Sequence, residues 1–492
     1  MQNAVSTRPQ GPPDNAAHDR RDLDRLSLAG CLLHDAPMRT NLSLLGLMLT
    51  ACSFTAAEPT SDGGVASDAT AAEPEDAPAA PPGTAEVAFI TYRNALGGHE
   101  LHVVAADGRN AYLWGNHDYT YTGNTIDMDT SDGAQRIAVG GGQGNINNKV
   151  LFFDYQGNKQ WETGANGNAQ GTRFYKGYFA QPIVAVGYHD NTFDVQPTGS
   201  QTATGVGFYA RDLTGKALAW HPQFPDGGGA SPFRGGALNV WHAYADEAHR
   251  RLFIMGEFAS AQKTDGSASG VPVSRIAVYE QAASGAMPQV PTATVRLGAS
   301  WFVSSSATKH AGNPWTMTQT SAFYYIGGHS FDTAATKAGA RVRVSSLVRV
   351  RISDLDLDTT WRPAFAPITT DSTTCAVVRE LARYGGEVLV AGRFTAFQGQ
   401  SRANLAAFDA ASGAITGRFS NLRVTGGEVL SIAVDGDRAY IAGTFTSVTD
   451  AHGAHARAQL ACIDLTTGLV TAWSPSPGVE VRRVRVLHVL AT

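Results

Sequence analysis

The sequence predicts an all-β fold built from repeated sheet units, and three observations lead to this prediction. Short apolar runs alternate with turn residues along most of the chain, and glycine accounts for 53 of the 492 residues. Long runs with the 3.6-residue spacing of an amphipathic helix are scarce. The same pattern of runs and turns recurs every few tens of residues. Many short strands with regular turn signals indicate an all-β protein, and repetition at this period is typical of a β-propeller.

The N-terminal part begins with a polar, charge-dense segment, residues 1–37. Met38 then starts a different pattern, in which Arg39 is followed by the apolar run 42–49. This run is too short to span a bilayer as a helix, so residues 38–52 are predicted to be an export signal. We interpret residues 1–37 as a mis-assigned upstream start and expect them to be disordered.

The end of this signal reads Leu49-Thr50-Ala51-Cys52 and resembles the lipobox of a bacterial lipoprotein signal peptide. The resemblance implies cleavage before Cys52 and lipidation of its thiol, and more than one acyl chain anchors a protein stably to a membrane. Ser53 resembles the sorting rule for the outer membrane. The resemblance therefore implies an outer-membrane lipoprotein of the bacterial cell envelope, periplasmic or surface-exposed. An ordinary secretory signal is the alternative.

Residues 53–84 consist largely of alanine, proline, acidic residues, threonine and glycine. They contain almost no large apolar side chains whose burial would offset the entropy lost on ordering. We expect a disordered tether here, with the folded domain occupying residues 85–492.

The clearest repeats are residues 387–419 and 438–473. Each has a β-run ending in Gly-x-Phe, a second run ending in Asp before a Gly turn, and a third run ending on an aromatic residue. Weaker copies precede them. The predicted unit ends lie 47 to 71 positions apart, near Trp114, Trp161, Trp220, Val290, Trp361, Phe419 and Trp473. These ends predict a seven-bladed β-propeller of four-stranded antiparallel blades.

The two ends of this domain predict how the propeller closes. The first unit begins at residues 87–92 with what reads as its second strand, and a further strand pattern at 479–486 follows the last unit. We predict that this C-terminal strand completes the first blade, which would remove open sheet edges.

Three family resemblances overlap in the domain. The units at 387–419 and 438–475 resemble the delta-sixty class of bacterial surface propeller repeats. The Asp…Gly…Trp endings at 212–220 and 464–473 resemble the tryptophan-docking motif of quinoprotein propellers, which implies that the Trp packs between blades. Residues 87–108 are similar to the repeat of the periplasmic Tol-system propeller. All three imply a propeller, and none implies a particular activity.

Composition and cysteine spacing argue against several functional classes. The net charge of −5 gives no electrostatic case for a nucleic-acid partner. Cys375 and Cys462 could pair, but we expect two buried free thiols. No zinc-site spacing, phosphate-binding loop, dinucleotide fingerprint or hydrolase signature is present in the sequence. We therefore predict no catalytic residues, metal site or cofactor.

In a propeller, the connections between blades and the loops between second and third strands lie on the same face. The candidate ligand residues are those that the topology places on this face. Loops on a rigid scaffold carry function more often than strands do. The alternative is a set of scattered polar loops without a shared pocket. The candidates for this ligand face are His117, Tyr119, Tyr121, His189, Asp190, His221, His329 and His452.

Two segments have part of a metal-site pattern. Residues 127–133 place oxygen ligands at alternating positions, partly like a calcium loop, but the Gly comes one residue late and no Glu follows at the required distance. A hairpin turn is the other interpretation. His452 and His455 lie close together in a predicted loop that offers no complete ligand set. We therefore expect no cofactor and leave calcium open.

Residues 304–320 are predicted to form a long insertion between two strands, and they contain Trp315. An exposed Trp there would indicate a sugar or protein contact, whereas a Trp folded over the edge of the blade would have a packing role.

Together these patterns predict a lipid-anchored cell-envelope propeller that binds a protein or carbohydrate partner as a scaffold or binding module. The alternative is a propeller enzyme, either a hydrolase or a quinoprotein-like oxidoreductase, with its site at the mouth of the central channel.

Overall fold

The structure is a computed structural model, and it describes part of the chain. The described residues are 85–93, 98–105, 112–114, 127–129, 136–140, 150–154, 159–162, 169–175, 183–188, 193–194, 202–203, 206–210, 220, 222–224, 240–256, 258, 260–263, 271–298, 313–329, 331–366, 376–475, 477 and 480–488. The predicted upstream segment, signal peptide and tether, residues 1–84, lie outside them.

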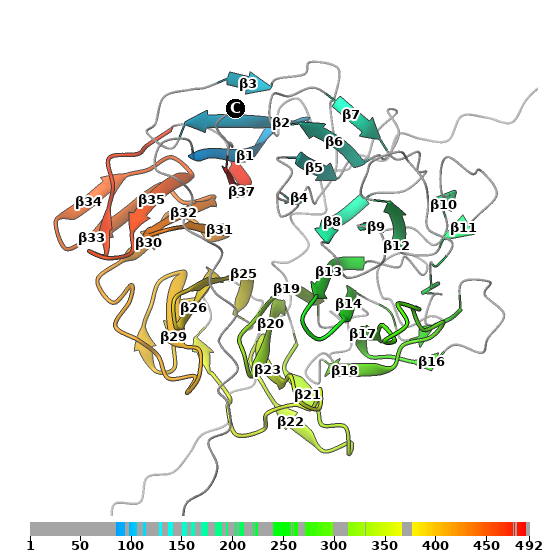
Figure 1. Ribbon diagram of the computed structural model, residues 1–492. Helices are drawn as coiled ribbons and strands as arrows, with labels where there is room; N and C mark the ends of the chain where they lie inside the picture. Colours follow the sequence, from blue (N-terminus) through cyan, green and yellow to red (C-terminus); the bar gives the residue numbers. More distant parts are fainter. Residues whose placement is uncertain are drawn as a thin grey trace, which may run out of the picture. The chain divides into compact units, whose positions relative to one another are not determined.

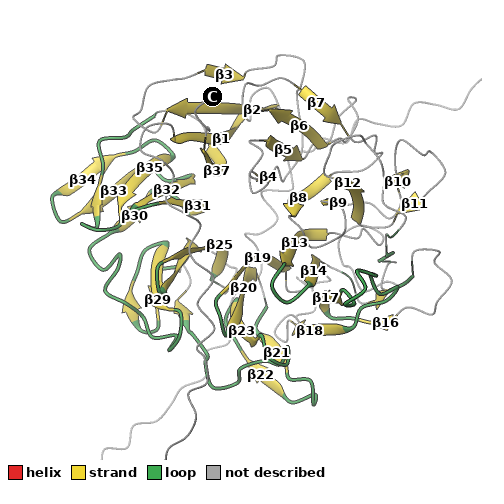
Figure 2. Cartoon of the chain, in the orientation of Figure 1, coloured by secondary structure: helices red, strands yellow, loops and turns green. Residues whose placement is uncertain are grey.

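All regular structure in these described residues is β-strand (Figure 2). Within the same residues, no helix has the length and apolar character needed to cross a membrane. Contacts divide the chain into two units, residues 1–72 with 369–373 and residues 73–368 with 374–492, and every described strand belongs to the second unit.

The main sheets of this unit follow one another along the sequence (Figure 1). One sheet has the order β3 (Tyr112–Trp114), β2 (Gly98–Ala105), β1 (Ala85–Arg93) and β37 (Glu480–His488). The next is β4 (Asp127–Asp129), β5 (Arg136–Gly140), β6 (Val150–Asp154) and β7 (Lys159–Glu162). It is followed by β8 (Ala169–Tyr175), β9 (Ile183–Tyr188) and β12 (Val206–Ala210), and then by β13 (Val240–Asp246), β14 (Arg251–Gly256), β17 (Arg275–Glu280) and β18 (Ala293–Gly298).

The C-terminal half continues the same arrangement. β19 (Asn313–Gln319), β20 (Phe323–His329) and β23 (Leu347–Arg351) pair in order, as do β25 (Val377–Tyr384), β26 (Glu387–Arg393) and β29 (Leu405–Asp409). A single residue pair, His329 with Val377, joins these two sets. The last sheet is β31 (Val429–Asp435), β32 (Arg438–Gly443), β35 (Leu460–Asp464) and β36 (Leu469–Val470).

The strands nearest the common centre, here called inner strands, contact one another in a closed series. β37 contacts β4, and the contacts then run through β8, β13, β19, β25 and β31 back to β37. Within this unit the main sheets therefore follow one another around that centre (Figure 1). A closed series of radially arranged antiparallel sheets is a β-propeller.

The predicted closure by a C-terminal strand is confirmed. β37 pairs antiparallel with β1, from Ala85 opposite His488 to Tyr92 opposite Glu480. β1 is consequently the second strand of its sheet counted from the centre, as the sequence indicated. The pairing covers an edge that β1 would otherwise expose.

Small hairpins lie between the second and third strands of several sheets. They are β10 (Phe193–Asp194) with β11 (Thr202–Ala203), β15 (Ser260–Ala261) with β16 (Val271–Pro272), β21 (Thr333–Ala335) with β22 (Arg341–Arg343), β27 (Ala396–Phe397) with β28 (Gln400–Ser401), and β33 (Ser447–Asp450) with β34 (Gly453–Ala456). Four of them pair with the segment that precedes their own sheet: β21 with β18, β27 with β24 (Phe365–Ala366), β33 with β30 (Arg423–Thr425), and Gln262 with Gln223. This pairing brings the connections between sheets and the hairpins together, as expected from propeller topology.

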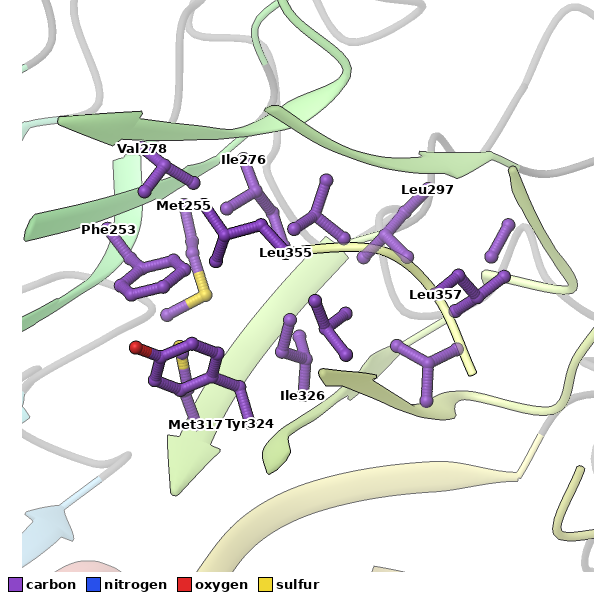
Figure 3. Packing of buried hydrophobic residues seen from close by; sticks show 14 of the residues in the cluster. Phe253, Met255, Ile276, Val278, Leu297, Met317, Tyr324, Ile326, Leu355 and Leu357 are labelled. Atoms are coloured by element: carbon purple, nitrogen blue, oxygen red, sulfur yellow. The ribbon is translucent and has the colours of Figure 1, made fainter. Parts of the chain in front are cut away.

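The core fills the wedges between neighbouring sheets. One cluster joins Phe253 and Ile276 of the β13–β18 sheet to Tyr324 and Ile326 of β20, all of them fully buried (Figure 3). Because side chains alternate between the two faces of a strand, one face of each sheet points into such a wedge. The packing of neighbouring sheets thus depends on large apolar side chains contributed by both.

Two tryptophans at predicted unit ends pack against the following sheet, as the docking-motif resemblance implied for Trp220. The Trp361 ring centroid lies 5.3 Å from that of Tyr325 on β20 and 5.1 Å from that of Phe408 on β29. Its Nε1 donates a hydrogen bond to the carbonyl of Gly413 in the next sheet at 2.8 Å. Trp220 likewise donates to the Pro288 carbonyl at 2.8 Å.

Candidate functional site

Six inner strands, β8, β13, β19, β25, β31 and β37, have a register shift near their first residues, and four of these shifts are single-residue bulges on consecutive strands from β13 to β31. The register shifts between Val240 and His242 on β13, Pro314 and Thr316 on β19, Val378 and Glu380 on β25, and Val429 and Ser431 on β31. A bulge places one extra residue opposite the partner strand and redirects its side chain. The extra residues are Trp241, Trp315, Arg379 and Leu430.

On β19, β25 and β31, the residue after the bulge connects the inner strand to the next one. Thr316 Oγ1 accepts the Leu381 N–H at 3.0 Å, and Glu380 Oε2 accepts the Ile432 N–H at 2.9 Å. Ser431 Oγ donates to the same Glu380 oxygen at 2.5 Å and accepts the Val484 N–H at 3.2 Å. These side chains satisfy backbone donors of neighbouring inner strands. They therefore fix the positions of the bulged residues beside them.

Two of the bulged residues meet at the centre of what we call the aromatic–arginine cluster: Trp315, His329, Arg379 and Glu428. The Arg379 guanidinium lies 4.7 Å from the Trp315 ring centroid. The His329 ring also stacks on Trp315, with centroids 5.2 Å apart and an interplanar angle of 7°. The cluster therefore joins β19, β20 and β25.

Glu428 holds the guanidinium in place. Its two carboxylate oxygens accept hydrogen bonds from Nε and Nη2 of Arg379, both at 2.9 Å. A bidentate pair fixes the plane of the guanidinium, which a lysine could not reproduce. The Arg379 side chain remains 25% exposed and that of Glu428 17%. The cluster thus presents a preorganised surface of flat rings and one oriented ion pair to solvent.

Such a surface suits recognition by stacking and by charge-assisted hydrogen bonds. Aromatic rings and arginine supply contact area at low entropic cost, and both are enriched at binding sites. Among the described residues, no group of three or more His, Cys, Asp or Glu side chains is arranged to hold a metal ion.

The predicted ligand-face residues are only partly covered by the structure. His329 belongs to the aromatic–arginine cluster, at the end of β20. His452 is exposed in the turn between β33 and β34, in a different sheet, and its N–H donates to Asp450 Oδ1 at 2.8 Å. The remaining candidates lie outside the described residues: His117, Tyr119, Tyr121, His189, Asp190 and His221.

The prediction for Trp315 was wrong in its local structure. Residues Asn313–Gln319 form the inner strand β19 and do not belong to an insertion loop. Trp315 is half-buried at the bulge, and its ring contacts both His329 and Arg379. Pro314 is the second residue of the strand, and its turn-like character masked the alternation that follows it.

Arg379 and Glu428 were missed by sequence reasoning altogether. They are 49 positions apart, so their pairing depends on two neighbouring sheets being assembled. The one signal in the sequence was the position of Arg379 within the repeat. Arg379 occupies the bulge position that is equivalent to that of Trp315 in the preceding sheet.

The His452–His455 segment forms an anchored hairpin. Asp450 Oδ1 lies 2.9 Å from His455 Nε2, and Asp450 Oδ2 accepts the Val470 N–H at 2.8 Å. Burial alone would raise the pKa of Asp450. The hydrogen bonds from Val470 N, His455 and His452 N outweigh that effect and lower the pKa to about 2.

The described residues include part of two other segments for which the sequence led to an expectation. Asp127–Asp129 forms β4, which pairs antiparallel with β5 as the hairpin interpretation predicts, while residues 130–133 lie outside the described residues. Cys462 is a free, buried thiol, as expected, and burial raises its pKa. Cys375 and the predicted lipidation site Cys52 lie outside the described residues.

No family model matches the chain, and no curated protein matches it. Among solved structures, the periplasmic gluconolactonase PpgL of Pseudomonas aeruginosa aligns with 82% of this chain and 99% of its own, at 12% identity and a TM-score of 0.43. Apo AztD of Citrobacter koseri covers 82% and 98%, at 11% identity and 0.37. BamB of Moraxella catarrhalis covers 77% and 93%, at 15% identity and 0.34. Likeness at these values carries no information on activity.

Proposed function

We propose that this protein is a lipid-anchored β-propeller of the bacterial cell envelope that binds a protein or glycan partner without catalysing a reaction. The aromatic–arginine cluster is the centre of the proposed binding face. The other predicted residues of that face, from His117 to His221, surround it in this proposal, together with His452.

The observation that carries the proposal is the contact chain from His329 through Trp315 and Arg379 to Glu428. Each member comes from a different strand or linker, and the bulges and inter-strand hydrogen bonds hold the set in one geometry. A rigid, half-buried aromatic and arginine surface fits the anchor residues of binding sites better than a solvated loop does. Partner residues or sugar rings would stack on the rings and pair with the oriented charges.

The proposed fold has seven blades of four antiparallel strands. The inner strands β37, β4, β8, β13, β19, β25 and β31 support the blade number. Isolated bridges from Val350 to Leu357 and from Phe408 to Ile415 support a fourth strand position beyond β23 and β29.

The proposed location is the outer membrane. It rests on the lipobox-like sequence that ends at Cys52 and on Ser53 after it. Residues 38–52 would be the signal peptide, and residues 53–84 would be the tether that holds the propeller of residues 85–492 away from the membrane.

The test compares partner binding by the full chain with that of Trp315→Ala and Arg379→Ala. Arg351→Ala is the matched control, because Arg351 is also a partly exposed, ion-paired arginine but lies at the end of β23. Binding is measured on a glycan array and by quantitative affinity capture from envelope extracts. Both cluster variants should lose at least about ten-fold in affinity, as expected for central aromatic and arginine anchors.

Retained binding in both cluster variants, with folding verified by thermal unfolding, would contradict the proposal. Conversion of a bound glycan into a new product would instead support the enzyme alternative.

A further inference from the structure

The outer part of the β13–β22 sheet carries a row of arginines on one face. Arg296 on β18 is directly opposite Ala335 on β21, which is directly opposite Arg341 on β22. Thr333 is likewise opposite Arg343. Directly opposite residues of antiparallel strands project from the same face, and so do residues two apart. The three arginines therefore share a face.

The opposite face of these strands is packed into the core. Val295 is 5% exposed, Leu297 3% and Ala334 2%, and Val342 packs against the same cluster. Figure 3 shows Leu297 directed into this cluster. Since neighbouring residues on a strand point to opposite sides, Arg296, Arg341 and Arg343 point outward, and all three are exposed.

A hollow of about 180 Å³ lies at the edge of these strands. Arg296 and Lys337 line it together with Val295, Leu355 and Leu357 of the core cluster, whereas Arg341 and Arg343 are not part of its lining. Lys337 is exposed and adds a fourth cation. We call Arg296, Lys337, Arg341 and Arg343 the arginine face.

The charge of this surface is predominantly positive. The carboxylate that lines the hollow, Asp356, is already engaged: Oδ1 accepts the Lys337 N–H at 2.8 Å, and Oδ2 lies 3.3 Å from Arg351 Nη2. Asp354 is paired with Arg351 as well, at 3.0 Å. A chain with a net charge of −5 thus carries a local excess of cations here.

We propose that the arginine face is a binding site for an acidic polysaccharide whose carboxylate or sulfate groups pair with the arginines. Arginine binds such groups bidentately. Arg296 and Arg341 are two strand spacings apart, which is roughly 10 Å, so the face suits a polymer with repeated charges better than a single small anion.

The side chains of this face also distinguish the ligand from a membrane surface. The described side chains between the arginines are Thr333 and Ala335, and they are not the aromatic or leucine side chains by which a protein face inserts into lipid. The proposal uses residues separate from the aromatic–arginine cluster and does not rest on the function proposed for it.

The test uses the full chain with Cys52→Ala, so that acyl chains do not contribute to binding, and polygalacturonate as the probe. Binding is expected in low salt and should weaken as NaCl rises from about 50 to about 500 mM, because exposed charges are screened. The double variant Arg296→Gln, Arg341→Gln should bind at least about ten-fold more weakly. Arg423→Gln, an exposed strand arginine on β30, is the matched control and should retain affinity.

Neutral dextran and vesicles of anionic phosphatidylglycerol complete the experiment. The proposal is overturned if polygalacturonate does not bind, if the double variant binds as well as the control, or if only the vesicles bind.

Discussion

At the scale of single residues, Gly413 shows how a missing side chain lets two sheets approach. Its φ is +75°, and its carbonyl accepts the hydrogen bond from Trp361. A Cβ at this position would lie 2.1 Å from Trp361 Nε1, so any other residue would displace the docked ring. The glycine of the repeat is thus required both for the turn and for the approach of the tryptophan.

Gly413→Ala should destabilise the protein more than Gly468→Ala does. Gly468 is the equivalent glycine of the next repeat, with a φ of +72°, and a Cβ added there would meet no atom within 4 Å. In both variants, the positive φ should lower the free energy of unfolding by about 1 kcal/mol. In Gly413→Ala, overpacking should lower it by about 1–3 kcal/mol more. Chemical denaturation measures the difference. Equal losses in the two variants would contradict the docking account.

Asp450 should make the β33–β34 hairpin sensitive to acid. Its folded-state pKa of about 2 is below the ordinary value, so its stabilising effect is complete above the unfolded pKa near 4 and declines as pH falls toward 2. The shift corresponds to about 2 kcal/mol at neutral pH, of which roughly half is lost by pH 3.

Hydrogen exchange of residues 447–456 tests this prediction. At pH 7, Asp450→Asn should lower the protection of these amides markedly relative to the unmodified protein, and the difference between the two proteins should shrink at pH 3. Asp464→Asn, in a different turn, is the control and should leave these amides unaffected. An equal difference at both pH values would show that the Asp450 charge is not the cause.

At the scale of elements, the sequence predicted what depends on local pattern. The pairing of β37 with β1 was predictable because a strand pattern at 479–486 had no repeat of its own, and the first repeat lacked its first strand. The docking of Trp220 against the following sheet was predictable because the Gly turn and the terminal aromatic recur together at 212–220 and 464–473. Both features can be recognised within one repeat unit.

The candidate site depends on features that no single repeat contains. Bulges on β19 and β25 decide that Trp315 and Arg379 are the extra residues, and a shift of one residue would turn them away. Glu428 reaches Arg379 only after the neighbouring sheet has assembled. Sequence reasoning found His329 by its loop position but could not identify the residues that it meets.

Removal of β37 should convert the closed series of sheets into an open one. A chain that ends before Glu480 loses the buried Val481 and Val484 and exposes the edge of β1. Exposed edges pair with other chains, so dimers or aggregates are expected in size-exclusion chromatography with light scattering, together with a lower melting temperature. A chain lacking only residues 489–492 is the control. A monomer of unchanged melting temperature would refute this role of β37.

At the scale of the whole molecule, the proposed anchor predicts where the protein is found. In the native host, the protein should incorporate labelled palmitate and sediment with outer membranes, because two or more acyl chains hold a protein at a bilayer. Cys52→Ala should abolish both the label and the sedimentation. Cys462→Ala is the matched control, since this thiol is 1% exposed, and should keep both. Label in the Cys52→Ala protein would disprove the assignment.

The pairing of the first and last described strands has a topological consequence. Ala85 is directly opposite His488, so the two ends lie one strand spacing apart. A turn of a few residues could join them. The polypeptide could then be opened at an exposed turn elsewhere, such as Gly385–Gly386 between β25 and β26, with every sheet pairing retained. The propeller is in this sense a cyclic object, and its linear order is one of several circular permutations that would build the same molecule.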